Sequence, residues 1–196
     1  EAYYALIQLD GDNMGAWLSG SEGKFTLTFR KSWHSQVQTG VAALSGNKNL
    51  ADYLVTSRPS SPARHMAISE ALNGFALDLV RHVVEDLYKG KLIYSGGDDV
   101  LAMVSVDDLL PAMLLLRLVY SGVFPADGDR ERCWRLLGQG RQEDWMDIAK
   151  GHVRYRQKLY RVMGEKATAS AGAVIAHHTD PLGSVLRALR QAEKRA

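Results

Sequence analysis

The chain has 196 residues, 46% of them hydrophobic and 23% charged, with 24 Lys and Arg against 22 Asp and Glu. This balance is typical of a globular protein that buries a core, and it excludes a disordered or fibrous chain. The formal net charge of +2 carries no information on nucleic-acid binding, which only local clusters of charge could indicate. A single cysteine, Cys133, excludes an intramolecular disulfide, and we expect a cytoplasmic protein.

The two ends of the chain indicate a piece of a larger protein. The chain begins at Glu1, next to an apolar run, and stops at Ala196 inside an expected helix. The longest apolar stretch, Leu109–Leu116, is far shorter than the roughly 20 residues that a membrane-spanning helix needs. We therefore expect residues 1–196 to be a single domain excised from a longer chain, with no membrane span.

The first expected elements are a strand and an irregular insertion. The aromatic and apolar run Tyr3–Leu9 predicts a buried strand that stops at Asp10, before a turn rich in Gly, Asp and Asn. Residues from about 20 to 58 hold no hydrophobic period, and only 33–44 has helical character. This stretch is therefore predicted to be an insertion on the surface.

A long amphipathic helix follows the insertion. Ser61 is a typical N-cap, and Pro62 suits the first helical position. Apolar residues then recur at steps of three and four from Ile68 to Leu87. We expect Gly90 to close this helix as a C-terminal cap.

Two short apolar runs, Leu92–Tyr94 and Val100–Val106, are separated only by Ser95–Asp99. This pattern predicts a β-hairpin with two acids at its tip. Further elements are expected in this order: a helix from Asp107 or Asp108 to about Val119, a second insertion over about 121–165 with a helix near Trp145–Tyr160, a strand at Thr168–Ala176, and a final helix after Pro181.

Without its insertions the chain reads β-α-β-β-α-β-α. This order favours an α+β fold with one antiparallel or mixed sheet and helices on one face, a ferredoxin-like palm. In such a sheet the end of the first strand lies beside the tip of the central hairpin. Asp10 would then meet Asp98 and Asp99.

Crowded carboxylates repel one another, and a hard divalent cation bound by oxygen ligands is the usual compensation. Two such cations can activate an attacking hydroxyl and stabilise a leaving oxygen. Gly96 and Gly97 let a nucleotide approach the backbone, and consecutive N–H groups in the loop 11–15 can cradle a triphosphate. Each motif alone is also ordinary turn chemistry. Their joint occurrence at a strand end and a hairpin tip favours a chemical site.

Three segments carry a resemblance to a known family: Tyr3–Gly15 with DGDNMG, Ser60–Val106 with SPARHMAIS and GKLIYSGGDDVLA, and Thr168–Ala196 with TASAGAVIAHH. Together they resemble the catalytic palm of the large signature subunit of type III CRISPR effector complexes, most closely the Cmr (type III-B) branch. The resemblance covers about half of the chain in the right order. It implies a relation to GGDEF diguanylate cyclases and class III nucleotidyl cyclases.

The resemblance implies synthesis of cyclic oligoadenylates from ATP, switched on when the complex binds target RNA. The 3′-hydroxyl of one ATP would attack the α-phosphate of another, and pyrophosphate would leave. The implied catalytic residues, which would also bind Mg²⁺ or Mn²⁺, are Asp10, Asp98 and Asp99. The implied nucleotide-binding residues are Gly11, Asp12, Asn13, Met14, Gly15, Ser95, Gly96 and Gly97.

The family also implies partners that this chain does not contain. Its members carry a second palm, and often a nuclease domain, upstream in the same subunit, and they assemble with other subunits, a guide RNA and target RNA. Relatives often place a phosphate-binding Lys after a Glu-x-x-Ala pattern in the last helix. Here Glu193–Ala196 ends just before that position, which leaves Lys194 as a stand-in.

Two other functions stay open at this point. The first is a diguanylate cyclase that uses GTP, although Asp99-Val100 stands where that motif has Glu-Phe. The second is a non-catalytic palm that binds a nucleotide or only serves the structure of a ribonucleoprotein. Separately, Lys150–Arg161 interleaves basic residues with two Tyr, which suits either contact with RNA or a neighbouring subunit, or a solvated helix face with Val153 and Leu159 inward.

Overall fold

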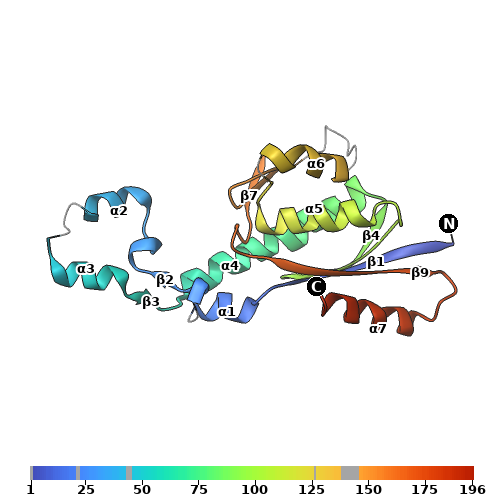
Figure 1. Ribbon diagram of the computed structural model, residues 1–196, viewed down its shortest axis with the longest axis horizontal. Coiled ribbons are helices and arrows are strands. Elements are labelled where there is room, and N and C mark those ends of the chain that lie inside the picture. Colours follow the sequence, from blue (N-terminus) through green and yellow to red (C-terminus); the bar gives the residue numbers. More distant parts are fainter. Residues whose placement is uncertain (1, 21–22, 43–45, 126, 138–145) are drawn as a thin grey trace. The chain divides into compact units, whose positions relative to one another are not determined.

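The computed structural model describes residues 2–20, 23–42, 46–125, 127–137 and 146–196. The chain forms two compact units, one of residues 13–67 and one that joins residues 1–12 to 68–196 (Figure 1). The larger unit contains Asp10 and the hairpin acids. The expectation of one palm domain with two insertions stays a prediction.

A four-stranded sheet in the order β4-β5-β1-β9 forms the centre of the larger unit. Its strands are β1 (Tyr3–Gly11), β4 (Gly90–Gly96), β5 (Asp99–Val104) and β9 (Ala169–His177). Every neighbouring pair is antiparallel. The strands predicted at the start of the chain, in the hairpin and near residue 170 are thus confirmed.

The long helix begins where its capping signal predicts. It consists of α4 (Pro62–Gly74) and two π-helical stretches, η3 (Phe75–Leu79) and η4 (His82–Leu87), and the Ser61 hydroxyl accepts a hydrogen bond from the N–H of Arg64 at 3.4 Å. Gly90 is not its C-cap, contrary to the expectation, but the first residue of β4. A Cβ at Gly90 would lie 2.8 Å from the carbonyl oxygens of Val84 and Met103, so a glycine lets the helix and the hairpin approach closely.

Helices cover both faces of the sheet, which corrects the expectation of a single covered face (Figure 1). The helix η3–η4 and α5 (Leu109–Ser121) lie on one face, and α7 (Leu182–Glu193) lies on the other. The physical reason is that β1 and β9 also present apolar side chains to the second face. The amphipathic helix α7 buries them in a cluster made of Leu6, Ala176, Val185 and Leu189.

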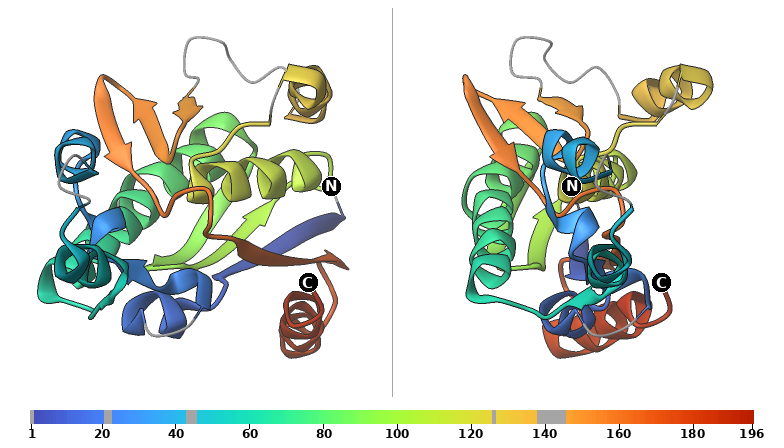
Figure 2. Two further views of the ribbon diagram at one scale, coloured as in Figure 1. Left: turned by 60° about the vertical axis from the view of Figure 1, so that its left-hand side comes forward. Right: turned by 90° about the vertical axis from the view of Figure 1, so that its left-hand side faces the viewer.

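The second insertion contains α6 (Asp127–Leu137) and a three-stranded antiparallel sheet, β6 (Asp147–Ala149), β7 (His152–Tyr155) and β8 (Lys158–Arg161) (Figure 2). The helix predicted at Trp145–Tyr160 is therefore wrong, and Trp145 lies outside the described residues. Two-residue turns reverse the chain here, with positive φ at Lys150, Gly151, Arg156 and Gln157. Burial alternates along β7, where Val153 and Tyr155 face inward.

The smaller unit is made of short elements: α1 (Met14–Ser19), η1 (Gly23–Phe25), β2 (Leu27–Thr28), η2 (Arg30–Ser32), α2 (Ser35–Ala42), α3 (Lys48–Val55) and β3 (Ser57–Arg58). Helix α2 confirms the helical character expected around residues 33–44. Aromatic pairs contribute to the packing of the smaller unit: Phe29 stacks on Tyr53 with 4.4 Å between ring centroids. Among the helices described in either unit, none combines the length and apolar character needed to cross a membrane.

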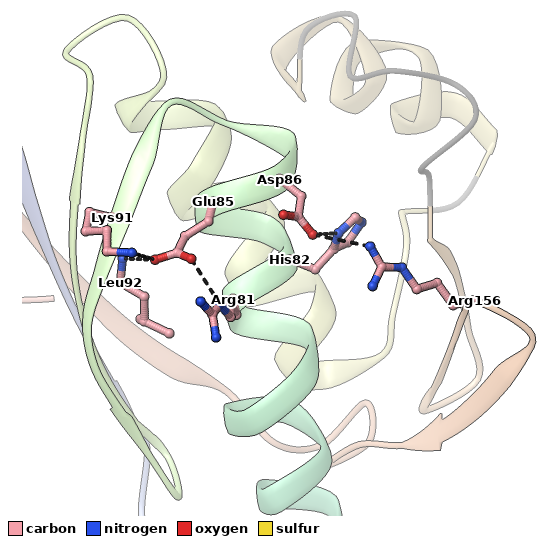
Figure 3. A network of polar contacts seen from close by, with 7 residues as sticks. All are labelled: Arg81, His82, Glu85, Asp86, Lys91, Leu92 and Arg156. Atoms are coloured by element: carbon pink, nitrogen blue, oxygen red, sulfur yellow. Dashed lines mark hydrogen bonds and ion pairs between the residues drawn. The ribbon is translucent and has the colours of Figure 1, made fainter.

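A carboxylate connects the long helix to the hairpin (Figure 3). Glu85 accepts hydrogen bonds from Arg81 Nε at 3.0 Å and from the N–H of Leu92 at 3.2 Å, and it forms an ion pair with Lys91 Nζ at 2.9 Å. The hydrogen bond from Lys91, followed by that from the Leu92 backbone, lowers the pKa of Glu85 to about 2. The charged carboxylate is therefore the form that holds η4 against the start of β4.

We expect Glu85→Gln to reduce the acid sensitivity of the fold. A carboxyl whose folded-state pKa lies below its unfolded value of 4.5 stabilises the fold above that value. This contribution is lost as the pH falls from 4.5 towards about 2. Urea unfolding at a series of pH values should show that the variant takes up fewer protons on unfolding in this range, by up to about one proton. Parallel pH curves for the two proteins would contradict the role assigned to Glu85.

Candidate functional site

Three acids meet at one end of the four-stranded sheet. Leu9 of β1 pairs with Val100 of β5, so the next residues, Asp10 and Asp99, lie side by side at that end. Asp99 pairs with Gly96, which leaves Gly97 and Asp98 as a two-residue turn. Asp10 is close enough to hydrogen-bond to the carboxyl groups of both Asp98 and Asp99.

Burial and crowding change the titration of Asp98 and Asp99. Burial, followed by the charge of Asp10, raises the pKa of Asp98, against the opposing effect of backbone N–H groups that include that of Gly11. Burial also raises the pKa of Asp99, and the charges of Asp10, Asp98 and Glu193 add to this effect. The fold therefore holds these carboxyl groups in a place where their charged forms are disfavoured.

A buried tyrosine lies beneath this cluster. Tyr120 of α5 is 1% exposed, and burial together with the nearby charges of Asp98, Asp12 and Asp10 raises its pKa. A Cβ at Gly11 would touch the Tyr120 hydroxyl and would lie 2.9 Å from Oδ2 of Asp98. Gly11 is thus required because the Tyr120 hydroxyl and the Asp98 carboxylate fill the space above its backbone.

Asp12 is held by Ser170 of β9 and by Thr168, the residue just before that strand. Its carboxylate accepts hydrogen bonds from the hydroxyls of Thr168 at 2.5 Å and Ser170 at 2.7 Å, and its N–H donates to the carbonyl of Thr168 at 2.9 Å. The N–H of Gly11 is likewise engaged by Asp98. Two of the five N–H groups expected to cradle a triphosphate therefore already have partners within the protein.

Glycine occupies positions 96 and 97 of the hairpin tip for two different structural reasons. Gly97 has a φ of 65°, which favours glycine, and a Cβ there would meet nothing within 4 Å. At Gly96 a Cβ would lie 2.5 Å from the hydroxyl oxygen of Tyr94, whose ring therefore folds across this glycine. The hydroxyl of the neighbouring Ser95 is buried and has no hydrogen-bond partner within the described part of the chain.

A cavity of about 240 Å³ opens beside Asp99 between the sheet and α7. Its polar groups come from Gln8 and Arg190, and Tyr94, Leu101 and Leu186 supply apolar walls. Helix α7 comes this close because Gly172 has no side chain; a Cβ there would lie 2.6 Å from Cα of Glu193.

The remaining expected site residues belong to the smaller unit. Asn13 adopts a left-handed conformation with a φ of 59° and caps α1, and Met14 and Gly15 form the first turn of that helix. Their contact with a nucleotide stays a prediction. In the described ranges no group of three or more His, Cys, Asp or Glu side chains is arranged to hold a metal ion.

Sequence reasoning missed Tyr120, Thr168 and Ser170. Tyr120 is one of several apolar positions on an amphipathic helix, so no local signal distinguishes it from the core. Thr168 and Ser170 lie in a run of small residues that predicts only close packing. Their hydroxyls become informative once β9 is known to pair with β1, with Ser170 opposite Asp10.

The sheet, its helices and the acidic hairpin tip are those of a mixed helix-and-strand palm domain. Residues 3–133 match the family model described as Cas10/Cmr2, second palm domain, and the chain belongs to this family. The resemblance found in the sequence motifs is thereby confirmed.

Two relatives support this assignment. The chain is 34% identical over 137 residues to the CRISPR system Cmr subunit Cmr2 of Pyrococcus furiosus, which covers 68% of this chain and 14% of that protein. It is 32% identical over 130 residues to the Cmr2 subunit of Saccharolobus solfataricus, which covers 64% of this chain and 10% of that protein. The chain therefore spans only a small part of the length of these relatives.

A chain of the type III-B Cmr-beta complex, solved by cryo-electron microscopy in the apo state, has a similar fold. The TM-score is 0.65 at 20% sequence identity, and the match covers 99% of this chain and 24% of that one.

We expect Gly11→Ala to destabilise the fold by about 1–3 kcal/mol, because the new methyl group overlaps Tyr120 and Asp98. Adding Tyr120→Phe removes the hydroxyl in the way and should restore part of the loss. Gly15→Ala is the matched control, since a Cβ at Gly15 meets nothing within 4 Å. Urea unfolding measures all four proteins, and equal stability of the two single Ala variants would contradict the packing described.

We expect Asp98→Asn and Asp99→Asn to stabilise the fold at neutral pH. An acid whose pKa is raised on folding contributes stability that is complete below its unfolded value of 3.8 and is lost as the pH rises through the folded value. The Asn variants avoid this loss, so their urea midpoints should exceed that of the parent at about pH 7 and match it at about pH 3. Asp129→Asn, on an exposed part of α6, is the control. Lower stability of both site variants at neutral pH would refute the repulsion.

Proposed function

We propose that this chain is the catalytic palm of a metal-dependent nucleotidyltransferase that converts ATP to cyclic oligoadenylates within a type III CRISPR ribonucleoprotein. The observation that carries the proposal is the meeting of Asp10, Asp98 and Asp99 at the end of the sheet in a chain of the Cas10/Cmr2 second palm family. The fold proposal that goes with it is a ferredoxin-like core related to GGDEF and class III nucleotidyl cyclase domains.

The three acids suit Mg²⁺ or Mn²⁺ by their chemistry. All their donors are carboxylate oxygens, and a bound cation would offset the burial and the repulsion that raise the pKa of Asp98 and Asp99. The described residues hold no preformed group of three ligands. Mg²⁺ commonly binds through one or two carboxylates together with water and substrate phosphates, so the nucleotide would complete the site. Bound there, the cations would stabilise charge on the attacking and leaving oxygens.

The chain's own groups would bind and orient the nucleotide. Gly97 leaves its backbone open, and the unpartnered Ser95 hydroxyl can serve a ligand. Gly11 and Asp12 use their N–H groups within the protein, and Asn13, Met14 and Gly15 complete the proposed phosphate-binding loop.

The cavity beside Asp99 suits a nucleobase or ribose. The Tyr94 ring offers a face for stacking, and Gln8 and Arg190 offer hydrogen-bonding groups. A base held there would leave its phosphates close to Asp99.

The proposed reaction joins two nucleotides. The 3′-hydroxyl of one ATP attacks the α-phosphate of a second, a phosphodiester bond forms, and pyrophosphate leaves. Positioning and charge stabilisation would supply most of the acceleration. Another palm of the same subunit would hold the second nucleotide, and target RNA bound to the guide RNA in the cytoplasm would switch the reaction on.

The first test is titration of ATP and GTP into the 196-residue chain with Mn²⁺, in parallel with the Asp98→Ala/Asp99→Ala variant. We expect ATP to bind only with the metal and to bind more than about 100-fold more weakly to the variant. This loss exceeds the roughly 10–100-fold effect that is usual when a residue that only supports a metal ligand is changed. The exposed pair Asp129→Ala/Asp147→Ala is the charge-matched control and should bind as the parent does. Preference for GTP would favour a diguanylate cyclase.

The second test uses the assembled complex with guide and target RNA, supplied with ATP and analysed by mass spectrometry. Cyclic oligoadenylates should form and should disappear in the same double variant. A complex that binds nucleotide but yields no product with the intact acids would refute catalysis and leave a structural palm.

A further inference from the structure

The three-stranded sheet β6–β8 is fixed to the long helix by its inner face. The ring of Tyr155 stacks on His82 with 3.9 Å between centroids and an angle of 29°. Arg156 lies 3.7 Å from the carboxylate of Asp86 (Figure 3). Its guanidinium is 5.0 Å from the Tyr155 ring centroid. Tyr160 packs against Gly74, where a Cβ would lie 3.1 Å from its ring. The inner face of this sheet is therefore packed against the long helix, and the opposite face is the outer one.

The outer face gathers cationic side chains. Cross-strand pairing places His152 opposite Arg161 and Arg154 opposite Leu159, and side chains that pair directly share a face. Lys150 lies in the turn that precedes β7. We call this surface the basic face and define it as Lys150, His152, Arg154, Leu159 and Arg161. Arg154 and Arg161 are exposed, as is Leu159, with 63% of its surface open to solvent.

These charges are largely uncompensated. Residues 146–161 contain five Lys or Arg (150, 154, 156, 158 and 161) and one Asp (147), although the whole chain carries only +2. The single carboxylate, Asp147, is opposite Arg154 in the sheet. Among the residues that the structure describes, no ion pair engages Lys150, Arg154 or Arg161.

We propose that the basic face binds the backbone of a single-stranded nucleic acid. Its cations complement phosphates, and the planar guanidinium groups of Arg154 and Arg161 suit two phosphate oxygens at once. Arg154 and Arg161 are diagonal neighbours on the adjacent strands β7 and β8. Such positions are about 7–8 Å apart, a separation at which the two side chains can contact successive phosphates of one strand. Leu159 lies among them and offers apolar surface to sugars and to unpaired bases. A duplex keeps its bases inside, so this contact favours a single strand.

The test measures binding of fluorescein-labelled RNA and DNA of about 20 nucleotides, unstructured and single-stranded, by fluorescence anisotropy at several KCl concentrations. We expect Arg154→Gln/Arg161→Gln to weaken binding by about tenfold or more at low salt and to reduce the slope against log salt by about 1.4, or 0.7 for each lost contact. Arg154→Lys/Arg161→Lys should retain most of the affinity. RNA and DNA arms report whether the 2′-hydroxyl matters.

Arg135→Gln/Arg187→Gln is the matched control, because both side chains are exposed and the charge change is the same. An equal loss in this control would show general attraction by net charge and would overturn the proposal. So would an absence of salt-dependent binding, or equal affinity for duplexes. Equal competition by polyglutamate would assign the face to an acidic protein instead. The Asp98→Ala/Asp99→Ala variant should bind the oligonucleotides as the parent does, which separates this surface from the nucleotide site.

Discussion

Repulsion among Asp10, Asp98 and Asp99 is the constraint that the rest of the larger unit has to overcome. The antiparallel pairing of β1 with β5 and the two-residue turn at Gly97 bring these acids together at one end of the sheet. Burial and mutual charge then raise the pKa of Asp98 and Asp99. The sheet holds the acids there because helices pack on both faces of β1 and β9, with α5 on one face and α7 on the other.

Support from both sides explains why helices cover two faces instead of one. On one face, Phe75 of the long helix packs edge-on against Tyr120 of α5, with 5.2 Å between ring centroids. Tyr120 in turn reaches beneath Gly11 to Asp98. On the other face, α7 packs on β9 and β1, and its end brings Glu193 near Asp99. The acidic site is therefore built from elements that are distant in sequence.

Local signals in the sequence predicted the elements that follow a regular pattern. Apolar periodicity and the Ser61-Pro62 signal predicted the long helix, and the two apolar runs on either side of Ser95–Asp99 predicted the hairpin. The three-stranded sheet escaped prediction because Lys150, Arg156 and Gln157 form its turns with positive φ, where Gly, Asn or Asp is the usual signal.

Part of the site was beyond any local rule. The meeting of Asp10 with the hairpin acids could be predicted from the sequence, because a palm-like strand order places them together. The roles of Tyr120 and Thr168 could not be predicted, because the partner of each hydroxyl is known only when the sheet has closed and its neighbours are in place. The cap at Gly90 failed for the same reason, since the approach of Val84 and Met103 to that glycine is a tertiary contact.

The energetics of the acids favour a chemical role over a structural one. An ordinary turn gains from Asp when the carboxylate accepts local hydrogen bonds, as Asp108 does from Ser105 and Lys89. Asp99 instead has a raised pKa caused by burial and by three neighbouring acids, so its charge opposes folding. A cation would reverse the sign of that interaction. An arrangement that costs stability in the free protein and would gain it with a bound cation suits the proposed metal site.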